Sequence, residues 1–465
     1  MNDITAFFAF QRYCLGSKSD VSKVIADMDW QELYSFASKQ ALLGLCFEGI
    51  ERLGKEYPEE LKQNPIGRGL LMTWMGKAQQ IRRQNMKVNA VASKLFSMLR
   101  EDGMRCCVLK GQGNALMYPN AYSRNPGDID VWIDASRERI MEYAQKKFEL
   151  GDDIRLQHLE TSLDGVPVEL HFFPCSMNNP IYHARLQKWF RRNADLQCSN
   201  VVGLPDGAGD IAIPTTAFNV VYQLTHLYHH FFDEGMGMRQ IIDYFLVVND
   251  FSKNVFLDYD FSNHPVPLSK EGSTFSPSPS SSGSGDVTAP SRCSEPLRSK
   301  DGGASKPSPD CAGWDRRGVS GDTSSASCSS ASGSSITSVR SAFTTDSSAS
   351  TALVVVQREL KYLGLWKFAG AVMYVLHEAL GLPEEKMIAP MDEKRGKLLL
   401  AEILEGGNFG RHFTKYGGFT HQSTGKKYFL KIWRNMHFVR YYPAEALSEP
   451  IFRTWHFFWR VKNKK

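Results

Sequence analysis

The sequence predicts an α+β protein in which a small mixed sheet is embedded in a mainly helical chain, with a long disordered insertion. Strand-like runs of alternating apolar residues are confined to about residues 104–175. On both sides of that segment apolar residues recur at three- and four-residue spacing, the period of an amphipathic helix. From about 270 to 350 the chain is dominated by Ser, Thr, Gly, Pro and Ala. Such a segment buries too little apolar surface to offset its ordering entropy, so we expect it to be disordered.

These changes in composition divide the 465-residue chain into five segments. Its 42 % hydrophobic content is enough for the cores of about two to three domains. The predicted segments are a helical region at 1–103, a sheet-bearing core at 104–175, a helical region at 176–268, the disordered insertion at 269–351, and a helical region at 352–465 that ends in a basic, aromatic tail.

Charge and cysteine content limit the class of protein. The net charge of +5 is compatible with anionic substrates but is too small to require nucleic acid. Nine cysteines without a Cys-x-x-Cys pair indicate reduced thiols. The N-terminus lacks a basic leader region, and no apolar run approaches the roughly 18 residues that span a bilayer. We therefore expect a soluble, cytoplasmic protein without a membrane span.

Two helices are predicted before the sheet, at 30–53 and 70–99, each followed by a glycine suited to a C-cap, Gly54 and Gly103. The apolar face of the second helix, from Met75 onward, is expected to pack on the sheet. Its basic face is expected to be solvated, although a polynucleotide acceptor would also suit it.

Two carboxylates open the second predicted strand of the core. Asp128 and Asp130 share one face there, while Ile129, Val131 and Ile133 take the other. Two carboxylates this close repel each other unless a cation lies between them, and oxygen ligands suit Mg²⁺ or Mn²⁺. Taken alone, the Asp-x-Asp pattern is also typical of a solvated strand end.

A third acid follows on a later strand. After Asp130 the pattern predicts a helix at 136–150 and a hairpin of strands at 154–162 and 166–172, and Glu169 lies on the second of these strands. Three acidic groups on adjacent strands can hold two divalent ions, and two ions can clamp the attacking and leaving oxygens of a phosphoryl transfer.

Phosphate contacts are predicted next to these acids. Lys110 and Gly111 end the first strand of the core, and a glycine there lets the backbone approach a phosphate. Arg124 lies four residues before Asp128, and a guanidinium fork matches phosphate oxygens. A loop arginine can equally be solvated, and that alternative stays open.

With these residues the core resembles the nucleotidyltransferase superfamily of the polymerase-beta type, and in particular an uncharacterised bacterial group of nucleotidyltransferase family proteins. The resemblance rests on Leu-Lys-Gly at 109–111, Arg-Asn-Pro-Gly-Asp-Ile-Asp-Val-Trp-Ile at 124–133 and Val-Glu-Leu-His at 168–171. It implies a nucleotidyltransferase-like sheet, metal ligation by Asp128, Asp130 and Glu169, and a phosphate loop at Gly111.

A histidine-rich helix is predicted at 216–232. Its three histidines, His226, His229 and His230, are spaced so that the first shares a face with both others. Zinc ligation is one interpretation, but without a fourth ligand signature packing or a substrate-facing role is expected.

Three residues from this part of the sequence and from the sheet are candidates for the cleft: His171, His226 and Arg239. His171 shares a strand face with Glu169 and is a candidate base or outer partner of the metal ligands. Arg239 is four residues from Asp243, so these two can pair on a helix surface.

Beyond the insertion, helices are predicted at 359–380 and 394–404, followed by a glycine-rich loop at 406–410 that suits either a ligand or a tight turn. The tail at 425–465 is basic and aromatic. That composition is typical of a nucleic-acid groove or a membrane-surface helix, and also of a helix that docks its rings on the core. We expect docking.

The sequence thus predicts a metal-dependent transferase that moves a nucleoside monophosphate from an NTP such as ATP to an unidentified acceptor, with Mg²⁺ or Mn²⁺ as cofactor and release of pyrophosphate. The acceptor is a small molecule, a protein or a nucleic acid. Two alternatives remain: a catalytically inactive, antitoxin-like binding module with the same fold, and a nucleic-acid binder that uses the basic tail.

Overall fold

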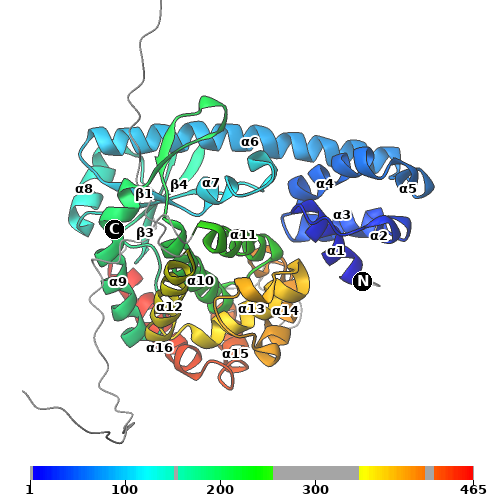
Figure 1. The fold of residues 1–465 in the computed structure, drawn as a ribbon. Coiled ribbons are helices and arrows are strands. Elements are labelled where there is room, and N and C mark those ends of the chain that lie inside the picture. The colour runs from blue at the N-terminus through cyan, green and yellow to red at the C-terminus, as the bar shows by residue number, and fades with distance from the viewer. Residues whose placement is uncertain (1–3, 151–154, 255–344, 414–423, 464–465) are drawn as a thin grey trace, which may run out of the picture. The chain divides into compact units, whose positions relative to one another are not determined.

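The computed structural model describes residues 4–150, 155–254, 345–413 and 424–463 (Figure 1). Helices dominate these ranges, and a four-stranded mixed sheet lies among them, which confirms the predicted α+β class. Residues 269–344 of the predicted insertion at 269–351 lie outside the described residues. Within the described residues a helix begins at Thr345, before the predicted end of the insertion at 351.

Five short helices form the N-terminal part: α1 (Ile4–Cys14), α2 (Ser22–Ala26), α3 (Trp30–Lys39), α4 (Leu43–Glu56) and α5 (Pro58–Gln63). The single helix predicted at 30–53 is wrong. Ala41 adopts a φ of 58°, and the Leu42 N–H donates to the Ala37 carbonyl at 2.7 Å, so α3 ends in a left-handed turn before α4 starts. Gly54 consequently lies inside α4 and does not cap a helix.

The long helix α6 (Arg68–Glu101) runs from the N-terminal helices across the sheet (Figure 1). Gly103 terminates it as predicted: its φ is 72°, and the Met104 N–H donates to the Leu99 carbonyl at 2.8 Å. Its C-terminal half packs on the sheet through Val88, Val91, Leu95 and Leu99. The sequence assigns Met75 to the same buried face. That prediction is wrong, because the Met75 side chain is exposed.

The sheet has the strand order β1-β2-β4-β3. β1 pairs antiparallel with β2, β2 pairs parallel with β4, and β3 and β4 form the predicted hairpin. Asp164 and Gly165 turn that hairpin with φ values of 49° and 71°. The elements of this region are β1 (Cys106–Leu109), α7 (Gly111–Ala115), the 3-10 turn η1 (Ala121–Ser123), β2 (Ile129–Ile133), α8 (Arg137–Lys147), β3 (His158–Leu163) and β4 (Val166–His171).

The two faces of the sheet have different surroundings. Val131 and Leu170 pack on the α6 side, in one apolar core. On the opposite face Trp132 stacks on Phe218 of α10, with ring centroids 6.2 Å apart. Asp130 shares this second face with Trp132, since side chains alternate along a strand. The polar groups of the sheet therefore face the helical half of the protein.

The helical half surrounds α10. Its elements are α9 (Pro180–Ser199), β5 (Val201–Gly203), η2 (Pro205–Gly207), β6 (Asp210–Ala212), α10 (Thr216–Asp233), α11 (Met238–Asn254), α12 (Thr345–Tyr362), α13 (Trp366–Leu380), η4 (Glu384–Lys386), α14 (Glu393–Gly406), η5 (Asn408–Gly410), α15 (Thr424–Met436) and α16 (Pro443–Asn463). The sequence misses the β5–β6 pair. It also predicts one helix at 359–380, whereas Gly364, with a φ of 76°, separates α12 from α13. Among the described helices, none combines the length and apolarity needed to cross a bilayer.

Candidate functional site

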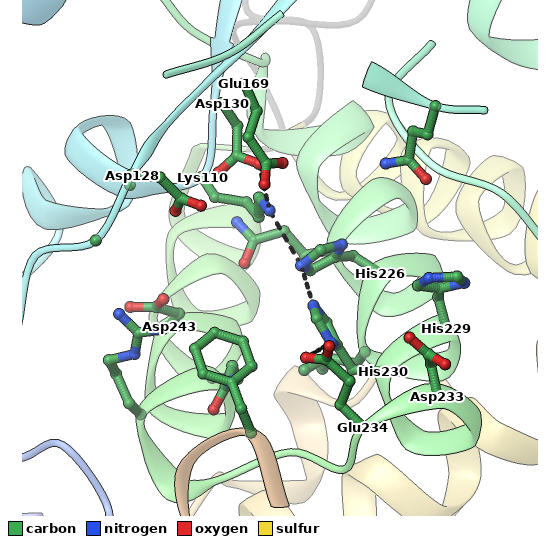
Figure 2. A pocket seen from close by; sticks show the side chains of 18 of the residues that line it. Lys110, Asp128, Asp130, Glu169, His226, His229, His230, Asp233, Glu234 and Asp243 are labelled. Carbon is green, nitrogen blue, oxygen red and sulfur yellow. Dashed lines mark hydrogen bonds and ion pairs between the residues drawn. The ribbon is translucent and has the colours of Figure 1, made fainter. Parts of the chain in front are cut away.

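A cavity of about 580 Å³ lies where the polar sheet face meets α10 and α11 (Figure 2). The ends of β1, β2 and β4 supply one wall, and α10, α11 and η5 supply the other. The predicted site residues that line it are Lys110, Gly111, Arg124, Asp128, Asp130, Glu169, His171, His226 and Arg239. The structure therefore gathers around one cavity residues that are up to 129 positions apart, from Lys110 to Arg239.

Three carboxylates occupy the sheet wall. Asp130 and Glu169 are register partners on the parallel strands β2 and β4, and Asp128 immediately precedes β2 on the same side (Figure 2). Asp130 is buried, whereas Asp128 is exposed. Repulsion by Asp130, desolvation of the carboxylate by the surrounding cavity walls and the charge of Glu169 raise the pKa of Asp128 to about 6. Negative charge is thus concentrated at this wall.

Lys110 compensates part of that charge. Its Nζ lies 3.0 Å from Asp130 Oδ1 and 3.1 Å from His226 Nε2. Burial favours a protonated Asp130, but Lys110 and His171 outweigh this and hold the pKa of Asp130 well below its usual range. Lys110 also adopts a φ of 53° and a ψ of −130°. This backbone conformation costs a non-glycine residue about 1–3 kcal/mol of free energy. Gly111 follows with a φ of 36°. The backbone at the end of β1 is therefore strained where the lysine enters the cavity.

His171 joins two of the carboxylates. Its Nε2–H donates to Asp130 Oδ1 and Glu169 Oε2, each at 3.1 Å. Burial alone would lower the pKa of His171, but these two hydrogen bonds raise it to about 9. Gln157 lies 3.3 Å from the other ring nitrogen and donates to the Pro174 carbonyl at 3.0 Å. His171 consequently fixes the two carboxylates relative to each other.

The histidines of α10 form the opposite wall. His230 Nε2 lies 2.9 Å from His226 Nε2, which continues the contact from Lys110 (Figure 2). Burial and nearby positive charge lower the pKa of His226 well below its usual value, and burial and His229 lower that of His230 to about 3. These rings are therefore neutral at neutral pH. All three line the cavity, as the substrate-facing interpretation requires.

The two arginines of the site have different partners. Arg124 donates from Nε and Nη2 to the two oxygens of Asp243, at 2.9 and 2.8 Å, in a buried ion pair. The predicted surface pair of Arg239 with Asp243 is therefore wrong. Arg239 instead donates from Nη1 to the Asn125 carbonyl at 3.1 Å, and its buried Nε has no hydrogen-bond partner among the described residues. The phosphate contact predicted for Arg124 stays a prediction.

Two histidines and a glutamate form a second cluster, which the sequence predicts only in part. His158 on β3 lies opposite His171 in the hairpin, and its Nδ1 is 3.3 Å from Glu169 Oε2. In the described part of the chain, His158, Glu169 and His171 are the group whose ligand atoms all lie within 4.8 Å of one another. The histidines of α10 do not form such a group there, so the structure gives no support to zinc ligation by them.

Several other lining residues were missed. Asp233 and Glu234 continue the face of α10 that carries His226 and His230, and this four-residue spacing could have identified them. Phe409, in the predicted glycine-rich loop, lies with its ring against His230, at a centroid distance of 5.4 Å. Long-range packing brings this loop to the cavity, and no local sequence pattern predicts it.

The sheet wall fits divalent cations. Carboxylate oxygens from Asp128, Asp130 and Glu169 are the ligands that Mg²⁺ and Mn²⁺ prefer. Mutual repulsion is the main cause of the raised pKa of Asp128, and a cation bound beside it would relieve that repulsion. The molecule is thus an α+β protein with a cleft in which one wall groups three carboxylates that could hold a divalent cation.

Comparison with known proteins assigns the chain to a family. A model of a family described as "Uncharacterised nucleotidyltransferase" matches residues 26–262, and the chain belongs to that family. The match confirms the nucleotidyltransferase part of the resemblance, and it leaves the bacterial group and the polymerase-beta superfamily as predictions.

Among solved structures, the chain is similar to an antigenic nucleotidyltransferase-like protein from Paracoccidioides brasiliensis. The identity is 16 %, the TM-score is 0.25, and the alignment covers 35 % of this chain and 75 % of the other. No curated protein matches the chain.

Proposed function

We propose that this protein is a metal-dependent nucleotidyltransferase that moves a nucleoside monophosphate from an NTP to an acceptor hydroxyl or phosphate. The acceptor oxygen forms a bond to the α-phosphorus, the bond from that phosphorus to the β-phosphate oxygen breaks, and pyrophosphate leaves. The observation that supports this most is the grouping of Asp128, Asp130 and Glu169 at one wall of a cavity that also holds Lys110 and Arg239.

In this proposal Asp128 and Asp130 hold Mg²⁺ or Mn²⁺, and Glu169 ligates an ion or takes the proton of the acceptor. The bound ions would supply Lewis-acid stabilisation of the charge on the transferred phosphoryl group. His171 keeps Asp130 and Glu169 at a fixed separation through its two hydrogen bonds. A rigid carboxylate pair matters because ligand geometry must be set before the substrate arrives.

The triphosphate contacts are assigned to Lys110, the Gly111 backbone and Arg239. Arg239 is favoured over Arg124 because its buried Nε has no protein partner among the described residues, whereas Nε and Nη2 of Arg124 already donate to Asp243. Arg239 also lies beside the residue before Asp128, since a Cβ at Gly127 would come within 3.9 Å of Arg239 Nη1. Arg124 is then the residue that positions Asp243 in the cavity wall.

The test is NTP turnover with Mg²⁺ or Mn²⁺, measured as pyrophosphate release together with the mass added to candidate acceptors. The substitution Asp130→Asn keeps the shape of the side chain but removes its charge. We expect it to lower kcat by about 10³-fold or more, because several kcal/mol of charge stabilisation in the transition state depends on the metal.

The matched control is Asp164→Asn in the hairpin turn, an exposed carboxylate paired with Lys94. It should turn over NTP like the natural chain. Equal turnover in Asp130→Asn and Asp164→Asn would contradict the assignment.

One observation favours a second function, a binding module without catalysis. Lys110 and His171 already contact Asp130, so the protein itself neutralises part of the charge that a metal would neutralise. Calorimetric titration with Mg²⁺ and each NTP separates the two functions, because an inactive module that lacks the metal site should give no metal-dependent heat of nucleotide binding.

A further inference from the structure

Helix α15 carries an exposed apolar face. Phe429, Trp433 and Met436 recur at four- and three-residue spacing, so they lie on one side of the helix. Phe429 is 70 % exposed and Trp433 62 % exposed. Large side chains exposed to this degree along one helix face mark an interaction site more often than a free surface.

Helix α16 repeats the pattern. Leu447, Ile451, Trp455 and Phe458 follow one another at the same spacing, and all four are exposed, Ile451 by 73 % and Phe458 by 65 %. The Tyr428 hydroxyl of α15 hydrogen-bonds with the Thr454 hydroxyl of α16, which joins the two helices. We call the exposed apolar side chains of α15 and α16 the aromatic face.

The opposite sides of these helices are firmly attached to the core. Arg434 donates to the Phe231 carbonyl at 2.7 Å, and Glu445 accepts the Asn178 N–H at 2.6 Å. Phe438, after the end of α15, is fully buried. The predicted docking of the tail is therefore right for this ring and wrong for Trp433, Trp455, Phe457 and Phe458, which are exposed. The aromatic face is consequently displayed on an anchored support.

Charge decides what kind of partner fits the aromatic face. Residues 424–465 contain ten Lys or Arg and two acidic residues, Glu445 and Glu449. Both acidic side chains are buried, whereas four of the basic residues are exposed: Lys426, Arg440, Arg460 and Lys462. A second copy of the chain would bring like charges together, which disfavours self-association through this face. An anionic partner fits instead.

We propose that the aromatic face binds the surface of an anionic lipid membrane. Helices that expose Trp, Phe and Ile together with basic groups lie in the headgroup region, where the rings are buried and the exposed cations meet anionic lipid. The aliphatic side chains Leu447 and Ile451 favour lipid over a nucleic acid, because bases stack on aromatic rings and gain little from aliphatic groups. This inference does not depend on the proposed transferase activity.

Co-sedimentation of the full chain with vesicles tests it. The protein should pellet with vesicles of mixed phosphatidylglycerol and phosphatidylcholine, and the bound fraction should fall at high salt. Vesicles of phosphatidylcholine alone should bind about tenfold less, since each basic group near an anionic surface adds to the attraction. Equal binding to both vesicle types, or binding to neither, would overturn the proposal.

The double substitution Ile451→Glu and Phe458→Glu places charge on the aromatic face. It should lower the vesicle-bound fraction at least about tenfold without changing the thermal midpoint, because both side chains are exposed. The control is Met72→Glu on α6, a similarly exposed apolar residue at 56 %, which should bind vesicles like the natural chain.

Two other results would contradict a lipid partner. A natural chain that sediments as a dimer, with a monomeric double variant, would assign the aromatic face to self-association. Binding of single-stranded polynucleotide that the same variant abolishes, without vesicle binding by the natural chain, would assign it to nucleic acid.

Discussion

The two walls of the cavity hold their charges in opposite ways. On the sheet wall, Asp128 and Asp130 crowd like charges together, and the pKa of Asp128 is raised to about 6 chiefly by that repulsion. On the helix wall, His226 and His230 are half-buried, and desolvation and the charge of Lys110 keep both rings neutral. The sheet wall therefore concentrates negative charge, whereas His226 and His230 of the helix wall are neutral hydrogen-bonding groups. The metal–nucleotide complex that we propose as the ligand would use both kinds of group.

The helix wall also contains a buried ion pair that should contribute to the stability of the protein. The helix wall depends on a desolvated ion pair, Arg124 with Asp243, to which the Tyr118 hydroxyl donates at 2.8 Å. Arg124→Leu should lower the free energy of unfolding by about 3–5 kcal/mol, because it leaves the Asp243 charge buried without its partner. Chemical denaturation measures this, and it is the largest stability effect that we expect.

The matched control is Arg105→Leu. Arg105 pairs with Asp134 and Asp195 but is largely exposed, so its loss should change the free energy of unfolding by less than about 1 kcal/mol. Adding Asp243→Leu to Arg124→Leu should recover part of the loss. If Arg124→Leu were no more harmful than Arg105→Leu, the ion pair would not be what holds the helix wall.

The helix wall should lose stability as the pH falls. His230 has an ordinary pKa of 6.5 and a pKa of about 3 in the folded chain, mainly because of burial. Below about pH 6.5 the unfolded chain takes up a proton that the folded chain does not, so the stabilisation is present above 6.5 and is lost toward pH 3. Between pH 6.5 and pH 4 the free energy of unfolding should therefore decrease less in His230→Gln than in the natural chain, by more than about 1 kcal/mol.

The control for this measurement is His437→Gln, which replaces an exposed histidine just after the end of α15. The slope of stability against pH should be the same in this variant as in the natural chain. An unchanged slope in His230→Gln would mean that the helix wall is not buried as described.

The contribution of the sheet wall to stability should change with pH in the opposite direction. The pKa of Asp128 is raised from 3.8 to about 6 in the folded chain, so the unfolded carboxylate ionises first as the pH rises. The relative stabilisation is present below about pH 3.8 and is lost as the pH rises through about 6. In buffer with a metal chelator, Asp128→Asn should thus raise the thermal midpoint at pH 8 by a few degrees at most, since Asp128 is exposed and screened.

At pH 4 the gain from Asp128→Asn should vanish. Asp164→Asn again serves as the control, because that exposed carboxylate is paired with Lys94. A gain of equal size at both pH values would show that something other than charge repulsion limits stability at the sheet wall.

The sheet wall was largely predictable from sequence, and the helix wall was not. Alternation along β2 and β4 is a local pattern, so the shared faces of Asp128 with Asp130 and of Glu169 with His171 follow from residues two apart. The hairpin turn at Asp164–Gly165 is equally local. These features required no knowledge of the tertiary structure.

The helix wall depends on contacts between distant segments. Arg124 and Asp243 are 119 residues apart, and the nearer partner in sequence, Arg239, gave the wrong pair. Helix breaks were missed for a similar reason. Ala41 adopts a left-handed φ that its residue type does not predict, and at Gly364 a Cβ would come within 2.6 Å of the Tyr182 ring. Sequence patterns describe a helix face but not which neighbour it meets.

Direct measurement of Mn²⁺ binding tests the central claim, that the three carboxylates of the sheet wall hold divalent cations for an NTP. Electron paramagnetic resonance of free Mn²⁺ follows binding to the natural chain and to the triple variant Asp128→Asn, Asp130→Asn, Glu169→Gln, each with and without ATP. We predict that ATP strengthens Mn²⁺ binding to the natural chain and that the triple variant binds no more Mn²⁺ than ATP itself does. Undiminished protein-bound Mn²⁺ in the triple variant would contradict the account.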